Sequence, residues 1–170
     1  MLEIEIKIKV DDLESTKNKI LSAGASLFKE RYFEKNSLYD FPKGDLYIKN
    51  QALRLRKINK KTYLTFKGPE RKSRKFKIRE EYETEIKNER QIIKILNALG
   101  LHKVFNYEKY RTVFLYKKLK ICLDELAIGN FIEIEGQQSD IVRFARLLDY
   151  SKKDFIKLDY IQMLKKERPL

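Results

Sequence analysis

Glu3-Ile-Glu5-Ile-Lys7 opens the chain with a strict alternation of charged and aliphatic residues. Successive side chains of a β-strand point to opposite faces, so this stretch predicts a strand with one charged face and one apolar face. The pattern returns in Glu81-Tyr-Glu83-Thr-Glu85 and in Glu133-Ile-Glu135. We therefore expect a sheet whose apolar faces pack against helices and whose charged faces meet either water or one another.

Cationic residues alternate in the same way along four further segments. These are Leu53-Arg54-Leu55-Arg56, Tyr63-Leu64-Thr65-Phe66-Lys67, Lys75-Phe76-Lys77-Ile78-Arg79 and Lys109-Tyr110-Arg111. One alternative is a set of salt-bridge ladders across an exposed antiparallel sheet. The recurrence of both signs of charge in one chain favours the other alternative, an inner wall around a hydrated cavity, because burying either sign alone is costly.

Composition limits the class of protein. The chain has 170 residues, of which 42% are hydrophobic, and this indicates one globular domain over residues 1–170. No apolar run approaches the ~18 residues of a membrane span, and the start does not resemble a signal peptide, so we expect a cytoplasmic protein without a membrane partner. The single Cys122 and the single His102 leave carboxylates as the ligands of any metal ion.

The residue pattern predicts an α+β fold with about eight mostly antiparallel strands. Eight such strands can close into a β-barrel with helices packed outside. Strand-like segments lie at 2–9, 26–35, 46–49, 51–57, 62–67, 75–86, 103–107, 109–116, 119–124 and 130–135. Helices are expected from about 13 to Gly24, at 88–99, at 140–149 and near 153–165. The outer face is expected to carry Ile4, Ile6, Leu53, Leu55, Leu64, Phe66, Ile132 and Ile134 toward helices, and Tyr82, on the face opposite Glu81 and Glu83, is expected to stabilise the fold by packing.

The ligand of such a wall would be a polyanion. The 38 Lys and Arg residues exceed the 25 Asp and Glu residues, for a formal charge of +13. A short polyphosphate suits a wall that carries both cationic and acidic side chains. Its oxygens bind guanidinium and ammonium groups, while divalent ions bridge it to carboxylates. The cations are spread through alternating strands beside glutamates, so we do not expect a nucleic acid as the partner.

In order along nearly the whole chain, these segments resemble the CYTH or triphosphate tunnel metalloenzyme family, which includes class IV adenylyl cyclases, thiamine triphosphatases and inorganic triphosphatases. The resemblance rests on the opening Glu3-Ile-Glu5-Ile-Lys7 and continues through the later motifs. Those motifs are Ala52-Leu-Arg-Leu-Arg56, Tyr63-Leu-Thr-Phe-Lys-Gly-Pro69, Arg79-Glu-Glu-Tyr-Glu83, Lys109-Tyr-Arg111, Cys122-Leu-Asp124 and Gly129-Asn-Phe-Ile-Glu-Ile-Glu135.

The resemblance implies a CYTH-like tunnel formed by an eight-stranded antiparallel barrel, with Lys7 and Glu5 as catalytic residues. It implies that one or two Mg²⁺ or Mn²⁺ ions are held by Glu3, Glu5, Glu133 and Glu135, with help from Glu81 and Glu83 and with Asp124 as a further carboxylate. It implies that a triphosphate is bound by Lys7, Arg54, Arg56, Lys67, Lys77, Arg79, Lys109 and Arg111.

Three functions remain open at this stage. We favour a metal-dependent triphosphatase acting on inorganic triphosphate and on nucleoside triphosphates, because hydrolysis needs no base pocket and the Tyr32, Phe33 and Tyr63 rings read as strand or core residues. The second is a class IV adenylyl cyclase that converts ATP to cyclic AMP and pyrophosphate. The third is a polyphosphate- or RNA-binding module without turnover. Open strand edges or exposed helices are compatible with a homodimer.

Overall fold

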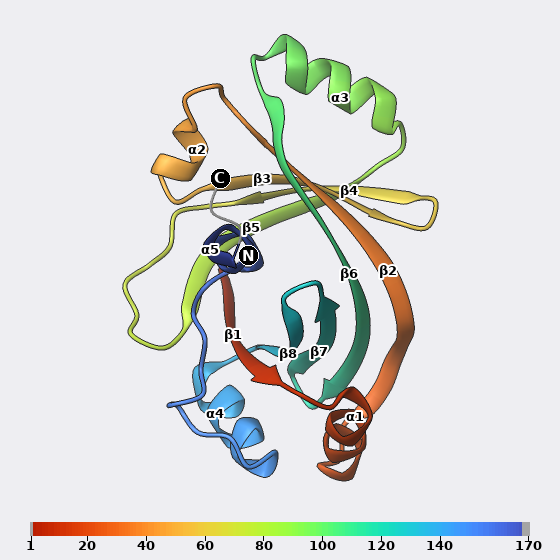
Figure 1. Ribbon diagram of the computed structural model, residues 1–170, viewed down its shortest axis with the longest axis vertical. Coiled ribbons are helices and arrows are strands. Elements are labelled where there is room, and N and C mark those ends of the chain that lie inside the picture. The colour runs from red at the N-terminus through yellow and green to blue at the C-terminus, as the bar shows by residue number, and fades with distance from the viewer. Residues whose placement is uncertain (1, 168–170) are drawn as a thin grey trace. The chain divides into compact units, whose positions relative to one another are not determined.

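The eight strands form a closed antiparallel barrel with the order β1-β5-β4-β3-β2-β6-β7-β8, which confirms the predicted α+β barrel (Figure 1). The structure is a computed structural model and describes residues 2–167. The strands are β1 (Leu2–Val10), β2 (Ser26–Asp40), β3 (Ala52–Ile58), β4 (Lys61–Lys67), β5 (Lys77–Ile86), β6 (His102–Tyr116), β7 (Leu119–Leu126) and β8 (Gly129–Glu135). The helices in the described part are α1 (Leu13–Ser22), α2 (Asp45–Ile48), α3 (Glu89–Ala98), α4 (Gln138–Leu147) and α5 (Tyr160–Glu167).

The chain divides into two compact units. The first contains residues 2, 33–71 and 79–108 and is called the Arg54 unit below. The second contains residues 3–32, 72–78 and 109–167 and is called the Lys7 unit. Strands β1, β2, β5 and β6 contribute residues to both units, and each unit has its own hydrophobic core.

The core of the Lys7 unit lies between strands and the helices α1 and α4. Ile6 of β1 and Ile132 and Ile134 of β8 are fully buried and share a cluster with Phe144 of α4. The Phe144 ring packs 4.8 Å from the Tyr116 ring. Full burial of an aliphatic side chain contributes about 1.5 to 3 kcal/mol, so this cluster stabilises the apolar faces of β1 and β8 against the helices. The outward orientation predicted for Ile6, Ile132 and Ile134 is confirmed.

The core of the Arg54 unit is smaller. Leu55 of β3 packs with Tyr39 of β2, Leu96 of α3 and Leu101, and Leu53 and Leu64 lie against them. The outer face is not covered everywhere, because Tyr82 of β5 is 58% exposed and its hydroxyl donates to Glu80. The expectation that Tyr82 is a packed residue was therefore wrong. Alternation predicts on which face a side chain lies, but not whether another element covers that face.

The strand register places charged residues side by side on common faces. Lys7 is paired with Glu133 across β1 and β8, and Arg111 is paired with Asp124 across β6 and β7. In the Arg54 unit, Arg54 faces Thr65, and Thr65 faces Glu83. Directly paired residues in a sheet point to the same face, so acids and bases from different strands become neighbours.

Two predicted elements have a different structure. Residues 46–49 belong to helix α2 instead of a strand, because Gly44 adopts a left-handed conformation and the Asp40 carboxylate accepts from the backbone N–H groups of Leu46 and Tyr47 at the start of the helix. Residues 103–107 and 109–116 form one strand, β6, since the alternation of burial continues across Glu108 without a turn.

The C-terminal segment also differs from the prediction. Only α5, from Tyr160 on, is helical, whereas a helix was expected from about residue 153. Ile156 instead makes an isolated antiparallel bridge to β1, in which the N–H of Lys7 donates to the carbonyl of Ile156 (3.1 Å) and the N–H of Ile156 donates to the carbonyl of Lys7 (2.8 Å). This bridge fixes the segment beside a charged strand.

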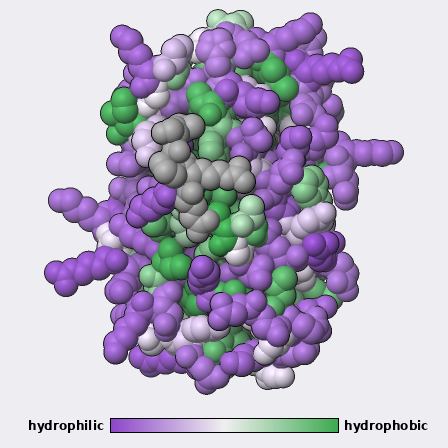
Figure 2. All heavy atoms as spheres, in the orientation of Figure 1, coloured by the Kyte–Doolittle hydropathy of each residue, from purple (hydrophilic) through white to green (hydrophobic). Residues whose placement is uncertain are grey.

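The visible surface is mostly hydrophilic with scattered apolar side chains, as Figure 2 shows. This agrees with a sequence in which 37% of the residues are charged. Among residues 2–167, no helix combines the length and the apolar character needed to cross a membrane.

Candidate functional site

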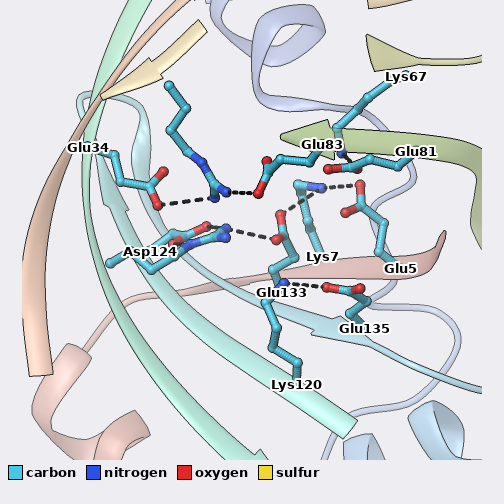
Figure 3. Close-up of polar contacts among 12 residues, drawn as sticks. Glu5, Lys7, Glu34, Lys67, Glu81, Glu83, Lys120, Asp124, Glu133 and Glu135 are labelled. Carbon is cyan, nitrogen blue, oxygen red and sulfur yellow. Dashed lines mark hydrogen bonds and ion pairs between the residues drawn. The ribbon is translucent and has the colours of Figure 1, made fainter. Parts of the chain in front are cut away.

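Each unit contains one cluster of charged side chains. The Lys7 cluster consists of Glu5, Lys7, Lys109, Arg111, Asp124, Glu133 and Tyr160. The Arg54 cluster consists of Glu34, Arg54, Arg56, Thr65, Lys67, Glu81 and Glu83. Figure 3 shows most of these side chains and the contacts between them.

The Lys7 ammonium group connects two carboxylates. Figure 3 shows the contacts of Lys7 with Glu5 and Glu133. Nζ lies 2.7 Å from Oε1 of Glu5 and 3.1 Å from Oε2 of Glu133, and the Lys7 side chain is only 3% exposed. Burial opposes the charged form, but Glu5 and Glu133 outweigh it and raise the pKa of Lys7 above its ordinary value. Lys7 therefore remains protonated at neutral pH, where it can donate hydrogen bonds and attract anions but cannot accept a proton.

Asp124 is the most heavily bonded carboxylate of the Lys7 cluster. Arg111 donates to it through Nε (2.6 Å to Oδ1) and through Nη2, Lys109 Nζ lies 3.1 Å from Oδ2, and the Tyr160 hydroxyl donates to the same oxygen at 2.7 Å. Asp124 is fully buried. A carboxylate with this many donors holds the surrounding cations in fixed positions.

Arg111 also contacts a second acid. Its Nη2 lies 2.7 Å from Oε1 of Glu133, while the other Glu133 oxygen faces Lys7. Burial opposes the charge, but Asp124 leads the charged neighbours that outweigh it and raise the pKa of Arg111 well above its ordinary value. Glu133 thus links the Lys7 and Arg111 cations.

The predicted metal ligands are distributed over both units. Glu3, Glu5, Asp124, Glu133 and Glu135 lie in the Lys7 unit, whereas Glu81 and Glu83 lie in the Arg54 unit. Across residues 2–167, no three acidic, His or Cys side chains converge as a ready metal site. Six of these carboxylates instead have a cation as a neighbour, namely Glu5, Glu81, Glu83, Asp124, Glu133 and Glu135, the last of which accepts from Lys120 at 2.6 Å.

Glu5 and Glu133 nevertheless fit one common mode of Mg²⁺ binding. Both converge on a single ammonium group, so their oxygens are close to one cation position. Mg²⁺ is usually held by one or two carboxylates together with water and substrate phosphates, which means that a full protein cage is not required. Asp124 fits this mode less well, because its oxygens already accept from Lys109, Arg111 and Tyr160.

The Arg54 cluster is also made of paired charges. Nη2 of Arg56 lies 2.6 Å from Glu83, and Nη1 of the same residue lies 3.6 Å from Glu34. Nη2 of Arg54 lies 3.8 Å from Glu83, a long separation for an ion pair. Thr65 donates to Glu83 at 2.7 Å and so orients this carboxylate between the two arginines.

The remaining predicted cations fall in different places. Lys67 of the Arg54 cluster contacts Glu81 at 2.5 Å, and Arg79 is buried in the same unit. Lys77 belongs to the Lys7 unit, where its Nζ lies 2.8 Å from Asp159. The predicted set of eight cations is therefore divided between the units, with Lys7, Lys77, Lys109 and Arg111 in one and Arg54, Arg56, Lys67 and Arg79 in the other.

Tyr160 is a site residue that the sequence does not reveal. Its ring lies 4.9 Å from Lys7 Nζ and 5.0 Å from Lys109 Nζ, and it packs edge-on against Phe131. Burial and the nearby Asp124 raise the pKa of its hydroxyl well above its ordinary value, so the hydroxyl remains a donor. Tyr160 carries no motif, and its position depends on the bridge at Ile156, which local pattern cannot predict.

Cys122 lies between these charged residues in β7 without belonging to their network. It is 1% exposed, and burial raises the pKa of its thiol to about 12. The thiol is neutral at physiological pH, which suits a packing residue and not a nucleophile.

Comparisons with known proteins match the chain over nearly its whole length. A protein of Methanocaldococcus jannaschii named putative adenylate cyclase MJ0240 is 26% identical, with 96% of this chain and 98% of that protein covered. The structure of a putative adenylate cyclase from Vibrio parahaemolyticus has a TM-score of 0.86 at 22% identity and covers 97% and 98% of the two chains. The structure of the putative adenylyl cyclase HpAC1 from Hippeastrum, described as having a dominant triphosphatase activity, has a TM-score of 0.69 at 18% identity, with 99% and 97% covered.

The family comparison agrees with these likenesses and with the resemblance of the sequence motifs. The model of the CYTH domain matches residues 1–162, which include β1 to β8 and all members of both charged clusters. The chain belongs to the CYTH domain family.

Proposed function

We propose that this protein hydrolyses triphosphates, both inorganic triphosphate and nucleoside triphosphates, with a divalent metal ion as cofactor. The observation that supports this most directly is the buried Lys7 ammonium between Glu5 and Glu133, with Arg111 on the far side of Glu133. Two carboxylates for a metal and two permanent cations for phosphate oxygens are thereby held within one network. The activity described for the Hippeastrum protein shows that a chain of this fold can be predominantly a triphosphatase.

The balance of positive and negative side chains in the Lys7 cluster supports a ligand that carries both positive and negative charge. The Lys7 cluster contains three cations, Lys7, Lys109 and Arg111, and three carboxylates, Glu5, Asp124 and Glu133. A bare polyanion would upset this balance in a buried site, whereas a metal ion and a triphosphate that bind together add both signs of charge. The metal, when bound, would neutralise phosphate charge and make water a better nucleophile at neutral pH.

The residues of this chain perform the remaining tasks in the proposal. Lys7 exchanges its contacts with Glu5 and Glu133 for phosphate oxygens, which frees the two carboxylates to bind the metal. Arg111 is held in place by its two hydrogen bonds to Asp124 and binds the phosphate with its other N–H donors. Guanidinium groups suit this role because they bind phosphate oxygens in a fixed geometry. Arg54 of the other unit, whose Nη2 lies 3.8 Å from Glu83, stays a predicted phosphate ligand.

Conversion of ATP to cyclic AMP and pyrophosphate is the second candidate. The observation in its favour is the 26% identical relative from M. jannaschii that is named a putative adenylate cyclase. Cyclisation requires the ribose 3′ hydroxyl to be directed at the α-phosphorus, whereas hydrolysis requires only water at a terminal phosphorus. The two functions therefore share phosphate ligands and differ in their products.

Product analysis tests both candidates. Purified protein is incubated with inorganic triphosphate or with ATP, with Mg²⁺, with Mn²⁺ or with a chelator, and the products are separated by chromatography. Phosphate and pyrophosphate from triphosphate, lost on chelation, would support the triphosphatase. Cyclic AMP and pyrophosphate from ATP would support the cyclase, and the absence of turnover with either substrate would contradict both.

A further inference from the structure

The exposed apolar side chains of the protein are concentrated around helices α2 and α3 of the Arg54 unit. Among residues 2–167, eight large hydrophobic side chains are more than half exposed, and five of them lie within residues 41–50 and 90–104. These five are called the α2–α3 patch below, and they are Tyr47, Ile48, Ile95, Leu99 and Val104. Scattered exposed apolar residues are normal on a protein surface, whereas a concentration of them indicates an interaction site.

The apolar stripe of α3 is wider than the core that it covers. Leu96 is buried in the core of the Arg54 unit, and Ile92 and Ile93 lie against that core. Residues three and four positions apart share one face of a helix, so Ile95 and Leu99 continue the stripe along one side of Leu96. Both are nevertheless exposed. The stripe therefore extends beyond the contact that folds the helix onto the sheet.

Helix α2 lies beside the C-terminal end of α3, as Figure 1 shows. Leu46 of α2 and the preceding Phe41 pack against the same core as α3. A side chain added at Gly100, directly after α3, would lie 3.8 Å from the Phe41 ring. Tyr47 and Ile48 follow Leu46 and are exposed, so two neighbouring elements of one unit contribute to the patch.

Cations flank the patch along the chain. Residues 41–50 and 90–104 contain one acid, Asp45, and five exposed cations, which are Lys43, Lys49, Arg90, Lys94 and Lys103. Exposed apolar side chains with lysine and arginine beside them are typical of proteins that lie on anionic membranes. The apolar groups enter the boundary between headgroups and acyl chains, and the cations attract the lipid phosphates.

Two other partners fit the α2–α3 patch less well. A second copy of the chain would bring the same cations together, and each copy carries a formal charge of +13, so the two would repel each other. A standard interface with another protein uses roughly 20 to 30 residues on each side, far more than the patch contains. A membrane contact needs only a few inserted side chains together with nearby positive charge.

We propose that the α2–α3 patch binds reversibly to the surface of an anionic membrane. Ile48, Ile95 and Leu99 enter the headgroup region, and the flanking cations lie near the lipid phosphates. The expectation of no membrane partner concerned a spanning segment, which a contact with the membrane surface does not require. The contact lies within the Arg54 unit and involves no turnover, so it stands or falls independently of the proposed triphosphatase function.

A tryptophan reporter tests the insertion directly. The chain contains no tryptophan, so a single introduced one reports on its own surroundings. Leu99→Trp and the control Leu147→Trp replace two exposed leucines that each lie at the C-terminal end of a helix. Vesicles of phosphatidylglycerol and phosphatidylcholine should shift the emission of Leu99→Trp to shorter wavelength and leave that of Leu147→Trp unchanged. Equal shifts of the two variants, or no shift of Leu99→Trp, would refute the proposal.

Co-sedimentation with the same vesicles measures the contribution of the apolar side chains. The double variant Ile95→Ser/Leu99→Ser should raise the lipid concentration for half-maximal binding about tenfold or more, because it removes two inserted side chains. Leu147→Ser is the control and should leave this concentration within about twofold. Binding of the double variant equal to that of the wild type would mean that the protein adsorbs through its net charge alone, and would overturn the proposal.

The cations are tested in the same assay. Lys94→Glu should weaken binding to phosphatidylglycerol vesicles several-fold, whereas Lys152→Glu, at an exposed position of the Lys7 unit, should have a smaller effect. Equal effects would contradict a contact centred on α3. Light scattering after size-exclusion chromatography tests the second copy as the partner. A dimer that dissociates in Ile95→Ser/Leu99→Ser would show that the patch is covered by another copy, and would overturn the membrane contact.

Discussion

At the scale of single residues, the main feature is that Glu133 contacts two cations in a buried environment. Its side chain is 11% exposed and its oxygens lie 3.1 Å from Lys7 and 2.7 Å from Arg111. Glu133 therefore has two tasks, because it balances these charges in the free protein and is proposed to bind the metal in the loaded one.

Replacement of Glu133 with Gln should affect both tasks. We expect the rate of triphosphate hydrolysis to fall by about 100-fold or more, since a metal ligand is lost. The free energy of unfolding should also fall, by up to about 3 kcal/mol, because Lys7 and Arg111 lose a negative partner in a buried site. Steady-state kinetics and urea unfolding measure the two effects.

The matched control for this change is Glu85→Gln, at an exposed ion pair with Lys61 on the neighbouring strand β4. Exposed pairs contribute about 0 to 1 kcal/mol, so this variant should be nearly as stable and as active as the wild type. Equal activity of the Glu133 and Glu85 variants would remove Glu133 from the proposed metal site.

Tyr160 should act as a positioning residue. Tyr160→Phe keeps the ring beside Lys7 and Lys109 but removes the hydrogen bond to Asp124, and we expect a loss of about 1 to 3 kcal/mol in unfolding free energy, as for other bonds to buried charged groups. Tyr160→Leu also removes the ring, and should raise KM for triphosphate further than Tyr160→Phe does. Identical KM values for both variants would show that the ring does not position the two lysines.

Cys122 should be unreactive in the folded protein. Its pKa of about 12 lies above the ordinary value of 9.0, so the native thiol is neutral across pH 7 to 9, and the stability that it contributes as a neutral group is lost only as pH rises from 9.0 through about 12. Alkylation by iodoacetamide at pH 8.5 should be rapid in denaturant and slower by orders of magnitude without it. Comparable rates in the two conditions would contradict the buried position of this residue.

At the scale of elements, helix α4 contributes to stability through one face only. Phe144 on this helix is fully buried against β-strand residues, whereas Leu147 is 52% exposed. Phe144→Ala should lower the unfolding free energy by about 3 to 5 kcal/mol, because it leaves a cavity in the core of the Lys7 unit. Leu147→Ala, on the same helix, should change it by about 0.5 kcal/mol or less. Similar effects in denaturant titrations would mean that α4 is oriented differently.

At the scale of the whole molecule, the formal charge of +13 should affect substrate binding. An excess of positive charge raises the local concentration of anions and accelerates their association, and salt screens this effect over a Debye length of about 10 Å at 0.1 M. We expect kcat/KM for inorganic triphosphate to fall at least several-fold between 50 mM and 500 mM KCl at constant free Mg²⁺. A constant kcat/KM would show that only short-range contacts bind the substrate.

Many local features could be predicted from the sequence. The alternation in Glu3-Ile-Glu5-Ile-Lys7 predicted the two faces of β1, and the structure confirms that Ile6 packs in the core while Lys7 lies among charged groups. The helices expected from about residue 13 and at 88–99 appear as α1 and α3, and Asp12 and Asn88 accept from backbone N–H groups at their N-termini. These features depend on the alternation of polar and apolar residues and on side-chain properties within a few residues along the chain.

Features that depend on distant residues could not be predicted. Helix α2 was taken for a strand, since the Asp40 carboxylate that binds its N-terminus is separated from it by a turn. Tyr160 was missed, because its place beside Asp124 is determined by residues 36 positions apart. The division of the predicted cations between two units likewise follows from strand pairing and not from the motifs themselves.

The family, the barrel class and most charged residues of the two clusters follow from the sequence alone, because alternation and motif order are properties of neighbouring residues. Which acid faces which base, and the contact of Glu133 with both Lys7 and Arg111, became known only from the fold. These contacts depend on strand register and on chain segments far apart in sequence, whose pairing reflects packing between strands and helices and not a local preference.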